Sequence, residues 1–346
     1  MIRNRATALV AALMATALAV TACGKSSDTG SGSDTGTPET TTAATSTAAA
    51  TGQPSDSGAP PASSGSGSGA PSNSGGSTPA GGSIVIGSAN FAESELLMNI
   101  YAEALKAKGV QVTTKPKIGA REVYVPALKD GSIDLVPDYT GNLLAYLDAK
   151  TKLTSSEEVY AALPAALGSD LKVLDQSAAQ DKDTYVVTKA TADKYQLKTI
   201  ADLAPHSKDM IIGAAAEFQT RAYGIPGLKS IYGVEFGKFQ PTDPGGPLSL
   251  NALKNNQVDV TDLFSTDPAI KANGFVMLED PKNMIAAQNV VPLINAKKST
   301  PAIDAALNAV SAKLTTENLT ELDQKVGAGG DSVQVAQEWV KAQGLG

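Results

Sequence analysis

The sequence predicts an α/β protein with a discontinuous first lobe, an inserted second lobe and two hinge crossings between them. Three observations lead to this prediction. Residues 83–136 alternate as strand, helix, strand, helix, strand, which is typical of a parallel sheet. A second α/β series begins near Thr188. The last helical stretches, near 301–314 and 332–343, have no strands of their own, so we expect them to pack back on the first lobe.

The first lobe opens with the apolar run SIVIGS at 83–88, which predicts a buried strand. The next helix carries apolar residues at helical spacing. Asn90 is its expected N-cap, with Glu93 three residues later, and Gly109 ends it. The other elements expected before the first crossing are a strand at 110–114, a helix at 121–129, a strand at 133–136, helices near 141–149 and 155–167, and strands at 171–174 and 184–188.

The crossings between the lobes are expected near 183–188 and 289–293, which assigns 83–186 and 290–346 to lobe 1 and 187–289 to lobe 2. Two α/β lobes joined by paired crossings form a hinge with a cleft between them. The expected elements of lobe 2 and of the return are a helix at 199–204, a strand at 210–214, helical segments after Glu217 and at 248–256, a strand at 258–263 and a returning strand at 290–295.

The start of the chain indicates export. Two arginines precede an apolar run from Ala6 to Val20, and small residues lead to Cys23, so residues 1–22 are predicted to be a signal peptide. The run is too short for a comfortable transmembrane span. The stretch VTAC before and including Cys23 resembles the lipobox of bacterial lipoproteins, which implies lipidation of Cys23. The other interpretation is an ordinary signal peptide with a chance cysteine, although a lone exported thiol otherwise needs a partner.

The residues after Cys23 predict a tether. Residues 24–82 contain no aromatic residue and no Val, Ile, Leu or Met, so they cannot bury enough apolar surface to offset their ordering entropy. We therefore expect 23–82 to form a lipidated, disordered tether with a reach on the order of 45 Å. Removal of the signal peptide lowers Lys plus Arg from 28 to 26 against 35 acids, a net charge of −9. This charge argues against binding to nucleic acid or to an anionic membrane surface.

The inventory of reactive residues argues against an enzyme. His206 is the only histidine, and it has no second His or Cys with which to hold a metal. The motifs GxSxG, HExxH, the P-loop and GxGxxG after a strand are missing from the sequence. We therefore expect a protein that is not an enzyme and that uses no metal and no cofactor.

Polar and aromatic residues instead gather where predicted strands end and helices begin. Together they offer aromatic faces, carboxylates and one fixed cation, a combination that suits a zwitterion. Aromatic faces and a carboxylate hold a quaternary ammonium group, and an arginine holds the carboxylate of the ligand in a bidentate pair. The four clusters are 137–142, 183–185, 217–221 and 262–267.

Each candidate residue also has a structural interpretation that the sequence leaves open. These interpretations are core tyrosines with a hydrogen-bonded hydroxyl for Tyr139 and Tyr185, a surface ion pair with Glu217 for Arg221, a helix cap for Asn142 and plain core packing for Phe264.

Five longer stretches carry a family resemblance: IGSANFAESELL, GAREVYVPALKDGSIDLVPDYTGNLL, TIADLA, EFQTRAYGIPGLKSIYG and DVTDLFSTDPAI. Through them, residues 83–346 resemble the substrate-binding lipoproteins of ABC transporters for glycine betaine, choline and related quaternary ammonium osmolytes. The resemblance implies a periplasmic-binding-protein-like fold whose two lobes close on a small osmolyte. It also implies a monomer, lipid-anchored on the extracytoplasmic face of the cell membrane, that delivers its ligand to a membrane permease driven by a cytoplasmic ATPase.

The resemblance implies roles for single residues. Tyr139 and Tyr185 match the first two places of an aromatic box, and Asp183 matches a carboxylate of that box. Arg221 matches the arginine that grips the ligand carboxylate, and Asn142 matches a position that hydrogen-bonds the same carboxylate.

This sequence also departs from the pattern of the family. Phe264 stands at the third box position and keeps the aromatic face without a hydroxyl. Gln288 stands at the fourth, where a tyrosine is expected, and Ala89 stands where relatives often carry Lys or Gln. Loss of one aromatic wall removes on the order of 1 kcal/mol of cation binding. Asn90 completes the set of candidate ligand-binding residues.

The expected function is that of a receptor for glycine betaine or a related quaternary ammonium solute. The alternatives are a receptor for choline, carnitine or an uncharged aromatic small molecule, and a cell-wall lipoprotein outside transport.

Overall fold

The structure is a computed structural model that describes residues 82–346. The predicted signal peptide, Cys23 and all of the predicted tether except Gly82 lie outside the described residues. Within 82–346, none of the helices is both long enough and apolar enough to cross a membrane.

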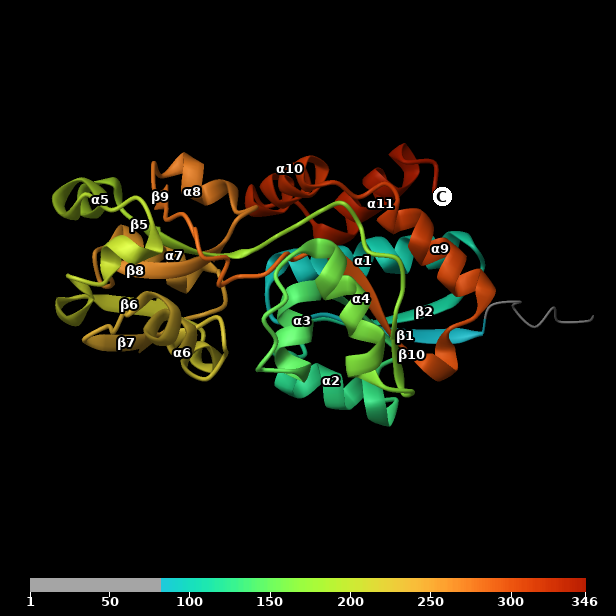
Figure 1. Ribbon diagram of the computed structural model, residues 1–346. Helices are drawn as coiled ribbons and strands as arrows, with labels where there is room; N and C mark the ends of the chain where they lie inside the picture. Colours follow the sequence, from blue (N-terminus) through green and yellow to red (C-terminus); the bar gives the residue numbers. More distant parts are fainter. Residues whose placement is uncertain (1–81) are drawn as a thin grey trace, which may run out of the picture. The chain divides into compact units, whose positions relative to one another are not determined.

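Lobe 1 is built on a five-stranded sheet of order β2-β1-β3-β10-β4 (Figure 1). Helices α1 and α9–α11 share one apolar core with this sheet, and α2–α4 share a second core with it. Its elements are β1 (Ser83–Gly87), α1 (Ala92–Ala107), β2 (Gln111–Lys115), α2 (Arg121–Asp130), β3 (Leu135–Tyr139), α3 (Thr140–Leu147), α4 (Ser156–Leu167), β4 (Leu171–Val173), β10 (Val290–Asn295), α9 (Pro301–Ser311), α10 (Thr316–Gly327) and α11 (Ser332–Ala342).

Lobe 2 is built on a second five-stranded sheet, of order β7-β6-β8-β5-β9. The predicted helix at 199–204 is a short 3₁₀ turn at Ile200–Leu203, and a second such turn, η3 (Ala216–Gln219), follows β6. The strands and α-helices of lobe 2 are β5 (Asp183–Val187), α5 (Lys189–Tyr195), β6 (Ile211–Ala214), α6 (Ile225–Gly227), β7 (Lys238–Pro241), α7 (Pro247–Lys254), β8 (Val260–Phe264), α8 (Pro268–Ala272) and β9 (Val276–Met277).

The parallel arrangement predicted for 83–136 is present, because β1 pairs in parallel with both β2 and β3. The sheet as a whole is mixed, since β10 runs antiparallel to β3 and to β4. Strand β10 returns from lobe 2 and therefore enters the sheet of lobe 1 from the opposite direction. This return brings residues that precede Val290 next to the end of β3.

The crossings lie earlier in the chain than predicted. Strand β5 pairs with β8 and β9 of lobe 2, so the expected boundary between 186 and 187 falls inside a strand of that lobe. The sheet pairing places the first crossing at 174–182 and the second at 278–289. An antiparallel bridge between Gln180 and Asn289 joins the two crossings side by side.

The expected cap of α1 is corrected by the structure. Helix α1 begins at Ala92, its N-cap position is Phe91, and no side chain caps it. Asn90 is exposed, and Glu93 is buried instead of closing a capping box. The N-terminus of α1 therefore carries a buried carboxylate, which becomes part of the site described below.

The C-terminal helices belong to lobe 1, as predicted. Helix α11 packs on α1, and α9 and α10 also contact α1, an arrangement visible at the red end of the chain in Figure 1. Leu319, Leu322 and Trp339 are buried in the same core as the strands β1 and β3. The sequence reading did not include α10, which begins with a capping box at Thr315 and Asn318.

Replacement of Leu322 by alanine tests whether α10 is an integral part of lobe 1. Leu322 is 1% exposed, so Leu322→Ala removes buried methyl groups and leaves a cavity, at a cost of about 2–5 kcal/mol of unfolding free energy. Denaturant unfolding measures this loss. Glu321→Ala, on the exposed face of the same helix, is the matched control and should change the value by less than about 0.5 kcal/mol. Equal stability of both variants would show that α10 is not packed as described.

Candidate functional site

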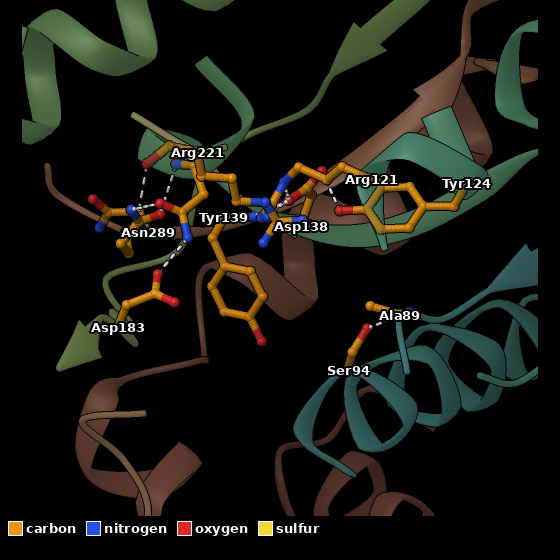
Figure 2. A network of polar contacts seen from close by, with 12 residues as sticks. Ala89, Ser94, Arg121, Tyr124, Asp138, Tyr139, Asp183, Arg221 and Asn289 are labelled. Atoms are coloured by element: carbon orange, nitrogen blue, oxygen red, sulfur yellow. Dashed lines mark hydrogen bonds and ion pairs between the residues drawn. The ribbon is translucent and has the colours of Figure 1, made fainter. Parts of the chain in front are cut away.

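The stretch from Pro137 to Asn142 joins β3 to α3 at the edge of the sheet where the chain crosses between lobes. Asp138 is fully buried and accepts hydrogen bonds from Arg121 Nε at 3.0 Å and Nη2 at 2.6 Å, and from the Tyr124 hydroxyl at 3.0 Å. Figure 2 shows these three side chains joined, with the ring of Tyr139 turned away from them. A buried ion pair with all oxygens hydrogen-bonded meets the condition for a stable buried charge, so Asp138 holds Arg121 at the wall of the site.

Tyr139 links this edge to lobe 2 through a carboxylate. Its hydroxyl donates to Glu93 Oε1, and Thr266 Oγ1 of lobe 2 donates to Glu93 Oε2 at 2.8 Å. Glu93 is 5% exposed. The carboxylate at the start of α1 therefore bonds to both lobes at once.

Asn142 makes a second contact between the lobes. Its Nδ2 donates to Asp183 Oδ2 at 2.6 Å, and Gln288 holds it on the other side. Gln288 Nε2 donates to Asn142 Oδ1 at 2.6 Å, and Gln288 Oε1 accepts from the Asn142 backbone N–H at 3.0 Å. Gln288 thus orients the amide of Asn142 so that its N–H group faces Asp183.

Gly141 permits this arrangement. A Cβ at this position would lie 2.5 Å from the Ala287 carbonyl oxygen, so only glycine lets the second crossing pass this close. Thr140 secures the approach, because its N–H donates to the Asn289 carbonyl at 3.0 Å and its Oγ1 accepts from the Asn289 N–H at 3.1 Å.

Arg221 follows the 3₁₀ turn η3 and reaches across to lobe 1. Its Nη2 lies 3.1 Å from Glu122 Oε2 and 3.6 Å from Glu217 Oε1, and its Nη1 donates to the Tyr223 hydroxyl at 3.0 Å. The pair with Glu217 is the alternative that the sequence left open. The pair with Glu122 is a third contact between the lobes, and the Arg221 side chain is 17% exposed.

Three aromatic rings from the two lobes meet in the site. Phe91 lies with its ring centroid 6.0 Å from that of Tyr139 and 4.8 Å from that of Phe264. Phe91 and Tyr139 belong to lobe 1 and Phe264 ends β8 of lobe 2. Such rings offer faces to a quaternary ammonium group.

These groups surround a small chamber of about 40 Å³. Its wall combines aromatic and acidic side chains with two arginines. The lining residues are Ala89, Asn90, Phe91, Ala120, Arg121, Tyr124, Pro137, Tyr139, Asn142, Asp181, Asp183, Ala215, Glu217, Phe218, Arg221, Pro244, Asp262 and Phe264.

Several carboxylates of the chamber are buried, which is unfavourable for a negatively charged group. Burial raises the pKa of Asp262 well above its usual range, and the neighbouring Asp183 raises it further. Burial and the charge of Glu93 raise the pKa of Asp181 in the same way. Asp262 Oδ1 has no hydrogen-bond partner among residues 82–346. These carboxylates need a positive charge or a proton nearby.

Glu93 is part of the same group of acids. Burial raises its pKa well above the usual range, and repulsion from Asp323 of α10 adds to the rise. Burial raises the pKa of Asp323 to about 7, and the charges of Asp181 and Asp267 add to the rise. The acids therefore form one coupled group at the contact between the lobes.

The chamber brings together most of the predicted site residues. Tyr139, Asn142, Asp183, Arg221 and Phe264 line it, as does Asn90, and Ala89 lies in its wall.

Two predicted residues lie elsewhere. Tyr185 is fully buried in the core of lobe 2, where its hydroxyl donates to the Tyr223 carbonyl at 2.9 Å and its ring packs on Phe218. Gln288 is fully buried behind Asn142 and contacts the chamber only through it. Tyr185 thus has the structural role that the sequence left open, and Gln288 positions Asn142.

Several residues in the wall of the chamber were not predicted from the sequence. Phe91, Arg121 and Asp181 line the chamber, and Glu93 bonds to Tyr139 behind it. Asp262, which also lines the chamber, lies in the predicted cluster 262–267. Phe91 and Glu93 follow a predicted strand end directly, so the rule that ligands lie at strand ends would have selected them. Only the fold shows that Arg121 and Asp181 approach this edge.

Comparison with known proteins adds the family context. Residues 82–342 match the family OpuAC, described as the substrate-binding domain of ABC-type glycine betaine transport systems. The glycine betaine-binding protein YehZ of Escherichia coli K12 is 26% identical over 278 residues, which cover 75% of this chain and 90% of that protein. The carnitine transport binding protein OpuCC of Listeria monocytogenes 10403S is 27% identical over 266 residues, covering 75% and 86%.

A solved structure shows the same fold. A crystal structure of a glycine betaine/carnitine/choline ABC transporter protein superposes with a TM-score of 0.59 at 24% identity. The match covers 76% of this chain and 99% of that chain. The two-lobed α/β fold predicted from the sequence is confirmed.

Removal of the Asp323 carboxylate should change how stability depends on pH. The folded-state pKa of about 7 lies above the ordinary value of 3.8, so the folded chain favours the protonated acid. The stability contributed by this group is present below about pH 4 and is lost as the pH rises through 7. We expect the stability of Asp323→Asn relative to the unaltered chain to increase between about pH 4 and pH 8, by at most about 4 kcal/mol.

Denaturant unfolding at a series of pH values measures this difference. Glu321→Gln, an exposed change on the same helix, is the control and should follow the unaltered chain at every pH. A stability difference for Asp323→Asn that stays constant over this range would contradict the raised pKa of Asp323.

Proposed function

The chain belongs to the family of substrate-binding domains of ABC-type glycine betaine transport systems, and from this premise we propose that it binds a zwitterionic quaternary ammonium solute in the chamber between its lobes. Glycine betaine is the simplest such solute. The family is one of solute receptors, and the candidate site contains the groups that such a ligand requires.

The observation that supports this proposal is the combination of groups in the wall of the chamber. Asp181, Asp183 and Asp262 line it together with the aromatic rings of Phe91, Tyr139 and Phe264, so a trimethylammonium group would contact π faces and offset the buried carboxylates. Arg221 lies in the same wall and presents a guanidinium to the carboxylate of the ligand. One zwitterion meets both needs.

The names of the relatives agree with this chemistry. One is a glycine betaine-binding protein and the other a carnitine transport binding protein. Glycine betaine and carnitine each carry a trimethylammonium group and a carboxylate. The chamber offers partners for both groups.

Ligand binding and lobe closure are coupled in this proposal. The polar contacts that join the lobes include those of Glu93 with Thr266, Asn142 with Asp183, and Arg221 with Glu122. A ligand that touches both lobes only when they are closed favours the closed state by that difference in contacts. The closed form would then dock on the permease, which a cytoplasmic ATPase drives.

We further propose that the receptor is a monomer anchored on the extracytoplasmic face of the membrane by lipidated Cys23. This part of the proposal rests on the apolar run before Cys23, on the VTAC stretch and on the family. The tether would let the folded lobes reach the permease.

Choline is the second candidate ligand, favoured by the pairing of Arg221. The guanidinium of Arg221 already contacts Glu122 and Glu217. The negative charge of the other acidic residues in the chamber therefore exceeds the positive charge that is free to balance it. A cation without a carboxylate would bind to the acidic and aromatic residues of the chamber and would not need Arg221.

Replacement of Arg221 by alanine tests both the proposed function and the choice between these ligands. Arg221→Ala should weaken the binding of glycine betaine roughly 10- to 150-fold, since a hydrogen bond to a charged group contributes about 1.5–3 kcal/mol. Choline binding should change little. Titration calorimetry on the full chain, at ligand concentrations up to the millimolar range, measures both affinities.

Lys229→Ala is the control for loss of a cation on lobe 2, because Lys229 pairs with Glu235 at the surface. This variant should bind both ligands as the unaltered chain does. If neither ligand binds to the folded, unaltered protein, the proposed function is wrong. An unchanged affinity of Arg221→Ala for glycine betaine would remove Arg221 from the site.

A further inference from the structure

A second, larger cavity adjoins the chamber. It has a volume of about 720 Å³ and lies between the start of α1, the loop that leads into α7, helix α8 and the end of α10. We call it the groove. Four residues line both the chamber and the groove: Asn90, Phe91, Pro244 and Phe264. The two cavities therefore share a wall that is formed by these four residues.

Phe91 and Phe264 form the separation. Their ring centroids are 4.8 Å apart, and they come from different lobes. Gly245, with φ of +64°, presses its backbone against the outer side of Phe264, where a Cβ would meet Cδ2 of the ring at 2.6 Å. Phe264 is held between this glycine and Phe91, so the pair acts as a gate whose position depends on both lobes.

The volumes indicate where a ligand larger than a compact head would extend. The chamber, at about 40 Å³, leaves no further room beside such a head. The groove, at about 720 Å³, falls within the range of roughly 300–1,000 Å³ found for ligand pockets. A substituent that passes the gate would enter a space large enough to contain it.

The groove is acidic beside the gate and apolar farther away. Glu93 bonds to Tyr139 and lies next to the gate. Asp323 lies in the same wall, and its Oδ2 is buried without a hydrogen-bond partner in the described chain. The other two acids of the groove, Asp243 and Asp267, accept hydrogen bonds from backbone N–H groups at the starts of α7 and α8. Their charges are thus already engaged.

Apolar side chains form much of the remaining wall of the groove, with the neutral polar residues Asn90, Thr266, Asn273 and Gln324 among them. Lys117 is the one Lys or Arg among its described lining residues, and it pairs with Glu95 at 3.1 Å. The apolar lining residues, which come from α7, α8, α10 and the loops between them, are Pro244, Pro247, Leu250, Pro268, Ala269, Ala272, Val326 and Ala328. The groove therefore complements a molecule with a cationic head and an apolar chain.

We propose that the groove receives the alkyl chain of a quaternary ammonium cation whose head lies in the chamber, and that Phe91 and Phe264 determine how long a chain is admitted. This inference rests on the proposed function, because it takes the chamber as the site of the head. It extends the ligand class from compact osmolytes to cations that carry an apolar chain. The wall that the two cavities share and the acids beside the gate support this choice of occupant.

A homologous ligand series tests the proposal. Titration calorimetry on the full chain compares tetramethylammonium with its ethyl, butyl and hexyl homologues, and glycine betaine serves as the compact reference. Burial of each added methylene in an apolar groove should strengthen binding about fourfold once the chain passes the gate. If the alkyl chain of the ligand stays in water, the affinity should be the same throughout the series.

Two neighbouring residues of α7 offer a matched pair of variants. Leu250 lines the groove, whereas Leu248 is 64% exposed and does not line it. Leu250→Asn should flatten the dependence on chain length and leave the affinity for tetramethylammonium unchanged, and Leu248→Asn should alter neither. Ala272→Gln, an exposed position of the groove on α8, repeats the test if Leu250→Asn fails to fold. Both replacements are neutral, so they leave the attraction for the cationic head as it is.

Each outcome is decisive. A fourfold gain per methylene that is lost in the groove variants and kept in Leu248→Asn supports the proposal. Equal affinities across the series, or a gain that the groove variants keep, overturn the role of the groove and leave the cation receptor intact. If neither tetramethylammonium, its homologues nor glycine betaine binds, the groove and the proposed function are both wrong.

Discussion

Carboxylates buried between two lobes constrain the whole site, because a charge removed from water costs several kcal/mol unless a cation, a proton or hydrogen bonds replace its hydration. The chain meets this cost in different ways at different positions. Asp138 has Arg121 and Tyr124 as partners, whereas the hydrogen-bond donors to Glu93 among residues 82–346 are two neutral hydroxyls. Asp262 keeps a buried oxygen without a hydrogen-bond partner among the described residues. At β3, the buried charge of Asp138 is thus balanced by its partners. At the contact with lobe 2, the buried carboxylates lack a balancing positive charge, which a cationic ligand would supply.

The same acids connect ligand charge with the closing of the lobes. Asp183 and Asp262 lie on the strands β5 and β8 of lobe 2, while Glu93 and Asn142 belong to lobe 1. Closing brings these groups together and removes water from them, which raises the free energy of the acids unless a positive charge enters the chamber. The contacts of Asn142 with Asp183 and of Glu93 with Thr266 offset part of this cost with hydrogen bonds. A cation between the lobes would offset more, so the charge of the ligand and the closed state favour each other.

Much of the site could be predicted because it lies where predicted strands end. Tyr139 and Asn142 follow β3, and Phe264 ends β8, so strand ends alone place them at one edge. Tyr185 shows the limit of this reasoning. It lies two residues inside β5 from Asp183, about 7 Å along the strand, and on that strand only the end reaches the chamber. The core of lobe 2 surrounds Tyr185, and no local pattern distinguishes a core tyrosine from one that lines a cleft. The first crossing was misplaced for a similar reason, since β5 reads as a strand without showing which sheet it joins.

The two α/β lobes, the return of the C-terminal helices to lobe 1 and the family could be predicted from the sequence, because they depend on apolar periodicity and on long motifs that are continuous in the chain. Which side chains meet depends on the fold. Gln288 stands 146 residues from Asn142 in the chain and nevertheless orients its amide, and Phe91 meets Phe264 only because α1 and β8 approach from different lobes. Such contacts depend on the hinge and on the close passage at Gly141. Hydrogen bonds and ring contacts act over a few ångströms, so the folded backbone determines them and the order of residues alone does not.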